Sequence, residues 1–266
     1  MNRGQGDKAS QGSGHPTPAF GKALDRLAEG AGLYRDDLKL SELAKAGPSS
    51  DEAIIALASL VVAHVDAVSE LGRRGPQLLP GAVSCARAAF ETAANLAWIA
   101  DPGDPAQREG RWLGWYAADA RFWENLCNDL RGRAPNESKY SGQIAAAKAK
   151  LVTDIARALQ EHLGYEMVAL PSLEKRLAGL GQQSSYTAYR QASQVVHGMP
   201  DAMGLVTFGD AHPPILKITW ATVLWMAWWS LNPLLVAFDR LGVDPKVDEF
   251  RSQTGRFMQS VGALSI

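Results

Sequence analysis

The sequence predicts an all-α protein: a single helical bundle of about eight helices over residues 19–262, behind a disordered N-terminal tail over residues 1–18. Three observations lead to this prediction. Apolar residues recur at the spacing of one helical face in each periodic segment. No segment shows the alternation of a strand followed by a turn. The tail is dominated by Gly, Ser, Gln and Pro, a composition that cannot bury a core.

The first half of the chain carries clear start and stop signals for helices. Helical periodicity begins at Phe20, and a short helix is expected near Leu38–Ala46, where a Gly-Pro pair ends it. Ser50 is a capping residue, and the two acidic residues after it favour a helix that closes at Gly72. The Ala-rich segment Pro80–Ala100 predicts a central helix, because the Asp-Pro-Gly-Asp-Pro sequence behind it is a strong break.

The second half continues in the same way. A long helix is expected over Ala106–Leu130, followed by a basic, loop-like stretch over Arg131–Pro135. The segment Gln143–Leu163 has the cleanest amphipathic pattern, and Gly164 is a suitable left-handed stop. Shorter helices are expected over Leu173–Leu180, from Ser184 or Ser185 to His197, and from Asp244 onward.

The segment Ile218–Phe238 needs a separate decision, because its 21 uncharged residues are long enough to cross a bilayer. Thr, Ser, Asn and Pro residues lower its hydrophobicity. Its four tryptophans stand at the centre, whereas interfacial tryptophans belong at the ends of a membrane span. We therefore expect a buried core helix, with a membrane span and a partner interface as the alternatives.

Charge and cysteine content restrict the function classes. Lys and Arg total 27 against 28 for Asp and Glu, so no global field attracts nucleic acid or anionic lipid. RNA binding would have to depend on a local patch, and we expect no DNA partner. Two cysteines are too few for a disulfide framework or a four-ligand zinc site. The N-terminus lacks the apolar region of a signal peptide, so we expect a cytoplasmic protein.

One polar group of residues lies on the expected central helix. Four polar residues are spaced three or four positions apart, so they share a single helical face: Ser84, Arg87, Glu91 and Asn95. Their neighbours are Ala, Val, Phe, Leu and Trp. An Arg and a Glu one turn apart can neutralise each other, and if buried they need further hydrogen-bond partners. Two interpretations stay open: an internal ion pair that fixes the helix register, or the wall of a polar functional site.

A second polar group lies on the helix expected to end at His197. Tyr189, Ser193 and His197 are spaced by four residues. Arg190 precedes His197 by seven residues, which is nearly two turns and roughly 10.5 Å along the axis, so the two side chains point the same way. Ser193 and Gln194 lie between them. This face offers a guanidinium, a hydroxyl, an amide and an imidazole.

Those groups suit the cleavage of a phosphodiester. The His197 imidazole can take a proton from a ribose 2′-OH near neutral pH. Arg190 can stabilise the charge that grows on the phosphoryl oxygens, with Ser193 and Tyr189 as orienting groups. The chemistry requires no metal and no other cofactor. A single histidine cannot act as base and acid at once, so a homodimer that brings two such helices together would supply both.

The motif of Arg190, six residues (QASQVV) and His197 resembles the HEPN superfamily of small helical bundles. Its ribonuclease members carry an Arg and a His, a few residues apart, near the end of a helix. The resemblance implies a metal-independent endoribonuclease that acts on RNA as a dimer, often in toxin or antiviral defence systems. Gln191 departs from the small polar residue that often follows the Arg in that superfamily.

A second resemblance is to bacterial helical proteins that combine an Arg-x3-Glu helix with a later Tyr-x3-Ser-x3-His helix, here Arg87 to Glu91 and Tyr189 to His197. It covers most of the region from about Val83 to Phe238, and it brings no established activity with it. Two main hypotheses therefore stay open. The chain is a HEPN-like ribonuclease, or it is a non-enzymatic helical protein whose Arg/Glu/His cluster is structural or binds a small ligand or partner. A protein anchored to a membrane through the Trp-rich helix is a third.

Overall fold

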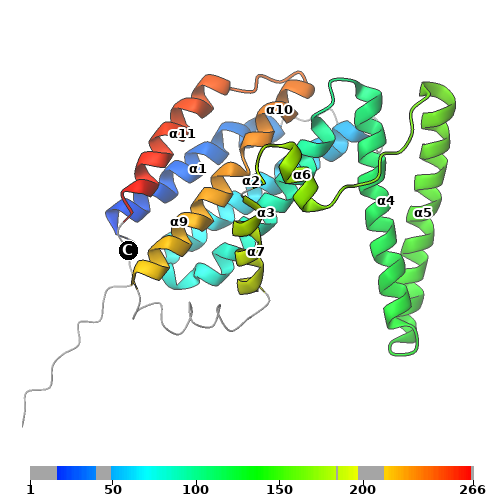
Figure 1. Cartoon of the computed structure of the whole chain (residues 1–266), viewed down its shortest axis with the longest axis horizontal. Coiled ribbons are helices and arrows are strands. Elements are labelled where there is room, and N and C mark those ends of the chain that lie inside the picture. Colours follow the sequence, from blue (N-terminus) through cyan, green and yellow to red (C-terminus); the bar gives the residue numbers. More distant parts are fainter. Residues whose placement is uncertain (1–16, 40–48, 184, 197–212, 265–266) are drawn as a thin grey trace, which may run out of the picture.

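The computed structural model describes residues 17–39, 49–183, 185–196 and 213–264, and these residues form helices and connections without a strand (Figure 1). The helices are α1 (Pro18–Lys39), α2 (Ser50–Arg74), the 3₁₀ helix η2 (Pro76–Leu78), α3 (Leu79–Ala100), α4 (Pro105–Leu130), α5 (Pro135–Leu163), α6 (Leu173–Gly179), α7 (Ser185–Val196), α9 (Pro213–Trp229), α10 (Asn232–Arg240) and α11 (Val247–Gly262). The predicted all-α bundle is confirmed.

Two sequence-based expectations fall mostly outside these residues. Residues 1–16 of the expected tail are not among them, and Pro18, which that tail included, opens α1. The short helix expected near Leu38–Ala46 is likewise outside, except for Leu38 and Lys39. Both of these residues belong to the end of α1.

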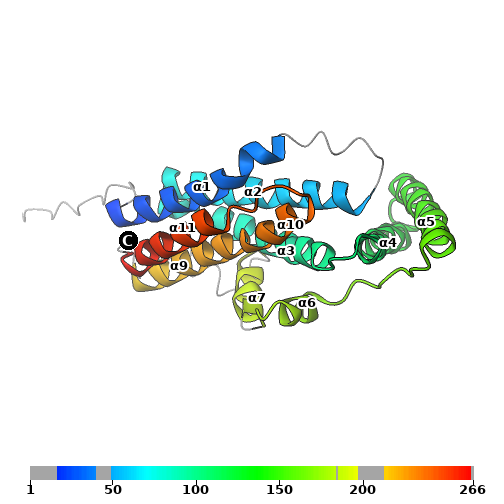
Figure 2. The ribbon, with the colours of Figure 1, turned by 90° about the horizontal axis from the view of Figure 1, so that it is seen from above.

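Helix α3 is the centre of the molecule. It contacts α2, α4, α6, α7, α9 and α10, and alanines such as Ala86, Ala89 and Ala93 are fully buried along it. Helices α1, α2, α3, α9 and α11 run side by side, whereas α6 and α7 lie on the side of the bundle away from α1 (Figure 2). Helices α4 and α5 form a hairpin that stands at one end and projects away (Figure 1).

The Trp-rich segment lies in the core, as the sequence suggested. On α9, Trp220 meets Phe20 of α1 edge to face, with ring centroids 4.8 Å apart. Trp228 stacks on Phe257 of α11 at 4.4 Å, and Trp229 lies 4.6 Å from Phe90 of α3. These three tryptophans are buried, so α9 joins α1, α3 and α11 through aromatic contacts.

The expected single helix over Ile218–Phe238 is divided into α9 and α10. Pro233 has no N–H to donate to the carbonyl of Trp229, and the side-chain amide of Asn232 donates to that carbonyl instead, at 3.1 Å. Among the described helices, two stretches are long and apolar enough to cross a membrane, Ser50–Arg74 and Thr219–Arg240. Half and two thirds of their most apolar windows, respectively, are buried inside the bundle.

The α4–α5 hairpin is longer than the sequence suggested. Helix α5 begins at Pro135 and not at Gln143, because proline at the first helical position needs no hydrogen-bond donor and already has a helical φ. Ser138 donates to the carbonyl of Cys127 at 2.9 Å, and Lys148 pairs with Asp119 at 2.5 Å, so polar contacts join the two helices along their length. Gly164 closes α5 in the left-handed conformation, as predicted.

An arginine cluster fastens the base of this hairpin to the bundle. The last carbonyls of α3 and of the turn behind it lack intrahelical partners. Arg111 donates to Trp98 at 2.7 Å, Arg240 to Ala100 at 3.3 Å, and the buried Arg108 to Gly103 at 3.2 Å. Positive charge at a helix C-terminus is favourable.

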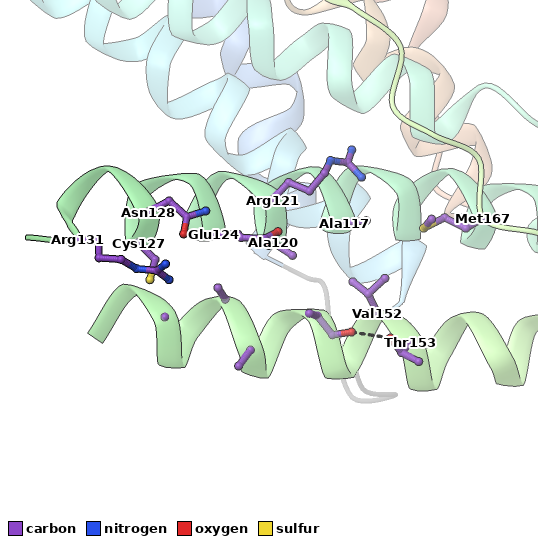
Figure 3. A pocket seen from close by; sticks show the side chains of 14 residues that line it. Ala117, Ala120, Arg121, Glu124, Cys127, Asn128, Arg131, Val152, Thr153 and Met167 are labelled. Atoms are coloured by element: carbon purple, nitrogen blue, oxygen red, sulfur yellow. Dashed lines mark hydrogen bonds between the residues drawn. The ribbon is translucent and has the colours of Figure 1, made fainter. Parts of the chain in front are cut away.

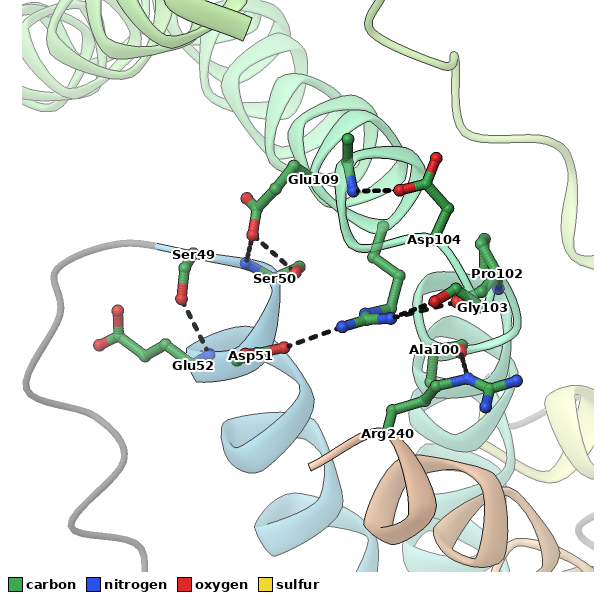
Figure 4. A network of polar contacts seen from close by, with 12 residues as sticks. Ser49, Ser50, Asp51, Glu52, Ala100, Pro102, Gly103, Asp104, Glu109 and Arg240 are labelled. Atoms are coloured by element: carbon green, nitrogen blue, oxygen red, sulfur yellow. Dashed lines mark hydrogen bonds and ion pairs between the residues drawn. The ribbon is translucent and has the colours of Figure 1, made fainter. Parts of the chain in front are cut away.

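The same junction caps α2. The carboxylate of Glu109 on α4 accepts hydrogen bonds from both the backbone N–H and the hydroxyl of Ser50, at 3.0 and 2.7 Å (Figure 4). An acceptor from another helix therefore satisfies a donor at the start of α2. Together with the arginines, this contact ties α2, α3, α4 and α10 into one junction.

Two glycines let the segment between α5 and α6 (residues 164–172) lie directly on α4. The N–H of Val168 donates to the carbonyl of Gly110 at 3.0 Å. A Cβ at Gly110 would come within 2.6 Å of the carbonyl oxygen of Glu166, and one at Gly114 would overlap the carbonyl oxygen of Val168. The path that leads the chain to α6 and α7 therefore depends on the absence of side chains at both positions.

Gly114→Ala is expected to lower the free energy of unfolding by about 1–3 kcal/mol, because its methyl group would displace backbone that has no room to move. Gly255→Ala on α11 is the matched control. Its Cβ would meet nothing within 4 Å, so helix propensity alone should stabilise the protein by up to ~1 kcal/mol. Urea denaturation followed by circular dichroism measures both. Equal stabilisation by the two changes would contradict the close approach of residues 164–172.

Candidate functional site

The polar group on α3 meets residues from α6 and α7. Arg87, Glu91 and Asn95 lie on the face of α3 that these two helices cover, and each side chain is partly buried. Ser84 does not join them, because it is exposed and its hydroxyl donates to the carbonyl of Pro80 at 3.0 Å. The site is therefore built on three of the four residues of that face.

Tyr189 of α7 bridges the arginine and the glutamate. The guanidinium of Arg87 donates to the Tyr189 hydroxyl at 3.0 Å, and that hydroxyl donates to the carboxylate of Glu91, also at 3.0 Å. The guanidinium also lies over the Tyr189 ring, 5.0 Å from its centroid. The two polar groups recognised in the sequence thus meet through this phenol.

The interpretation of Arg87 and Glu91 as an internal ion pair needs correction. Their side chains are 24% and 45% exposed, and the closest charged atoms are 4.0 Å apart. The short helices α6 and α7 cover this face of α3 only in part, so water reaches the carboxylate. The pair is held mainly through Tyr189 and not by direct contact inside the core.

Arg176 of α6 is the member of the cluster that the sequence analysis missed. It is only 8% exposed, and its guanidinium donates to the side-chain oxygen of Asn95. Burial lowers the pKa of this guanidinium, and the nearby Glu91 carboxylate opposes that shift. Arg176 stands with Leu173, Leu177 and Leu180 at the spacing of one apolar helical face. A charged residue on an otherwise apolar helical face is the sequence signal that could have identified Arg176 as a buried member of the cluster.

The cluster has a positive surplus, with two guanidinium groups against one carboxylate. Burial raises the pKa of the Tyr189 hydroxyl; the hydrogen bond from Arg87 opposes this shift and the charge of Glu91 adds to it. The phenol therefore stays protonated at neutral pH and remains a hydrogen-bond donor. Phe90 and Tyr186 stack on its ring at 6.3 and 6.1 Å and fix its orientation.

The other predicted residues of α7 lie differently. Arg190 is exposed, and Ser193 is half-buried one turn beyond Tyr189. The description of α7 ends at Val196, so His197 lies outside the described residues. The structure therefore brings together Arg87, Glu91, Asn95 and Tyr189, and leaves Arg190, the next residue along α7, exposed. In the described part of the chain, no group of three or more His, Cys, Asp or Glu residues is arranged to hold a metal ion.

Two cavities lined by described residues lie away from this cluster. An open groove of about 530 Å³ runs between α4 and α5, and alanines of both helices are among the residues that line it (Figure 3). Its Arg121 and Arg131 share the lining with Glu124, so both charge signs are present. A second cavity of about 490 Å³ lies between α1 and α11. Neither is lined by a residue of the polar cluster.

Tyr189→Phe is expected to destabilise the protein by about 1 kcal/mol, because it removes both hydrogen bonds of the hydroxyl and keeps the ring stacking. The matched control is Tyr186→Phe, since no described residue offers a hydrogen-bond partner to that hydroxyl. Urea denaturation compares the two variants with the wild type. Equal stabilities for all three would mean that the Tyr189 bridge contributes nothing.

Comparison with known proteins finds a match to the part of the chain that contains the polar cluster. Residues 51–211 match a family of unknown function, DUF5677. No curated protein and no solved structure matches the chain. The matched region extends from the first turn of α2 beyond α7 and contains the whole polar cluster. Since it covers more than half of the 266 residues, the chain belongs to this family of unknown function, DUF5677.

Proposed function

We propose that this protein is a metal-independent endoribonuclease of the HEPN type, with Arg190 and His197 as its catalytic pair. The observation that carries the proposal is the position of Arg190. Its side chain is exposed on α7 directly after Tyr189, which Arg87 and Glu91 hold in place. A guanidinium open to solvent on a firmly seated helix is suited to binding a phosphodiester.

The chemistry assigns one role to each residue. His197 takes the proton from the ribose 2′-OH, whose oxygen attacks the adjacent phosphorus. Arg190 stabilises the negative charge on the phosphoryl oxygens, and Ser193 orients the phosphate. The bond from phosphorus to the 5′-oxygen breaks, and the leaving oxygen takes a proton. His197 of a second copy supplies that proton in the homodimer we propose, and the products are a 2′,3′-cyclic phosphate and a 5′-hydroxyl.

The polar cluster supports a second candidate, a non-enzymatic helical protein. Hydrogen bonds join Arg87, Tyr189 and Glu91, and another joins Arg176 to Asn95, so the cluster connects three helices, although the buried Nε atoms of both arginines have no partner among the described residues. Such a network can serve only to attach α6 and α7 to the bundle. The two candidates differ in what they require of Arg190. A structural role for the cluster needs nothing from this exposed side chain, whereas cleavage depends on it.

The test is cleavage of single-stranded RNA in the presence of EDTA. His197→Ala should lower the cleavage rate by about 10²–10⁴-fold, as expected for loss of a general acid and base. Arg190→Ala should be severely impaired, and Arg190→Lys only partly restored, because a point charge cannot reproduce the planar guanidinium fork. Product analysis should find the cyclic phosphate or the 3′-phosphate derived from it.

Matched controls are His162→Ala at the end of α5 and Arg251→Ala on α11, both exposed residues on other helices. They should cleave as the wild type does, and all variants should keep their melting temperature. Absence of EDTA-resistant cleavage in the wild type, together with a much lower melting temperature for His197→Ala, would overturn the proposal. The non-enzymatic candidate would then replace it.

A further inference from the structure

The cavity between α1 and α11 has an unusual charge. Three cationic side chains line it, Lys22 and Arg26 from α1 and Arg256 from α11, and none of the described residues of its lining carries a carboxylate. Lys22 and Arg26 are one turn apart on α1, so both face the same space. In a chain with a net charge of −1, three cations around one cavity form a local positive surplus.

The surplus persists after the nearby ion pair is taken into account. An Nη–H of Arg26 donates a hydrogen bond to the carboxylate of Glu29 at 2.5 Å, and Glu29 is outside the lining. The Nε of Arg26 is buried and has no hydrogen-bond partner in the part of the chain that the structure describes. Among the same described residues, buried Nε atoms without a partner also occur at Arg87, Arg108 and Arg176, so the charge of the lining, and not this atom, is what points to an anion.

The remaining lining also suits an anion. Gln259 of α11 offers an amide donor, and Ala19 belongs to the first turn of α1, where the helix carries positive partial charge. The hydroxyl of Ser260 donates to the carbonyl of Arg256 at 3.0 Å, so it is already committed to the helix. The start of α1 and the end of α11 meet at the same end of the bundle (Figures 1 and 2).

We propose that this cavity binds a small organic polyphosphate of nucleotide size. The charge of the ligand follows from the cations, since Lys22 and Arg256 can each pair with one anionic oxygen group and Arg26 keeps further N–H donors beside its pair with Glu29. Its size follows from the volume of about 490 Å³, which is far more than one phosphate needs and within the range of small-molecule sites. The site shares no residue with α7, so it is independent of the proposed ribonuclease.

Isothermal titration calorimetry on the full chain at low salt tests this site, with ATP, pyrophosphate and inorganic phosphate as probes. ATP should bind, and pyrophosphate should bind more weakly because it leaves part of the cavity empty. Lys22→Glu and Arg256→Glu should each weaken ATP binding by about tenfold or more, since each removes one charge-assisted contact and adds a repulsion.

Arg251→Glu is the matched control. Arg251 lies on α11 with Arg256, is exposed, and is not part of the lining, so the variant changes net charge by the same amount. It should bind ATP as the wild type does. All three positions are at the surface, and circular dichroism should show unchanged helix content.

Three results would overturn the proposal. The first is the absence of ATP and pyrophosphate binding at low millimolar concentration. The second is an equal loss of affinity in Arg251→Glu, which would show a response to net charge alone. The third is preferential binding to vesicles of anionic lipid, or to single-stranded RNA, that Lys22→Glu and Arg256→Glu abolish while ATP fails to compete.

Discussion

The rest of the structure depends on the burial of α3. This helix is covered by neighbours on nearly every side, yet it carries Arg87, Glu91 and Asn95 on one face. Polar groups that lose water must find partners or destabilise the fold. Tyr189 hydrogen-bonds to the first two residues, and Arg176 hydrogen-bonds to the third. These hydrogen bonds to the polar face of α3 therefore determine where α6 and α7 lie.

The same reasoning applies to the end of α3. Its last carbonyls would be orphaned where the chain turns into α4, and Arg108, Arg111 and Arg240 donate to that region. The junction orients the α4–α5 hairpin, and the glycines on α4 then guide residues 164–172 back toward α6. The position of α7, on which the proposed catalytic face depends, thus follows from contacts along the middle of α3 and at its C-terminal end.

Local signals made most helices predictable. The break after Ala100 and the Gly164 stop act within a few residues, so they can be read from the sequence. The start of α2 was misplaced by one residue, because Ser49 and not Ser50 is the N-cap and accepts from the N–H of Glu52, and α2 continues past the expected end at Gly72 to Arg74. The start of α5 at Pro135 and the division before Asn232 were missed because Pro135 was assigned to a loop and Pro233 was read only as lowering hydrophobicity. Arg87, Glu91 and Asn95 were visible as one face. The contact between Asn95 and Arg176 could not be predicted, because helical periodicity does not show which helices, distant in the sequence, pack against each other.

The most direct test of this account is hydrogen exchange measured by mass spectrometry on Arg87→Met/Asn95→Ala. This variant removes contacts of α3 to both α6 and α7 and leaves the apolar core intact. The account predicts faster exchange over Leu173–Gly179 and Ser185–Val196, with Val247–Gly262 as protected as in the wild type. Unchanged protection of α7, or an equal loss of protection in α11, would contradict the claim that the polar face of α3 holds α6 and α7 in place.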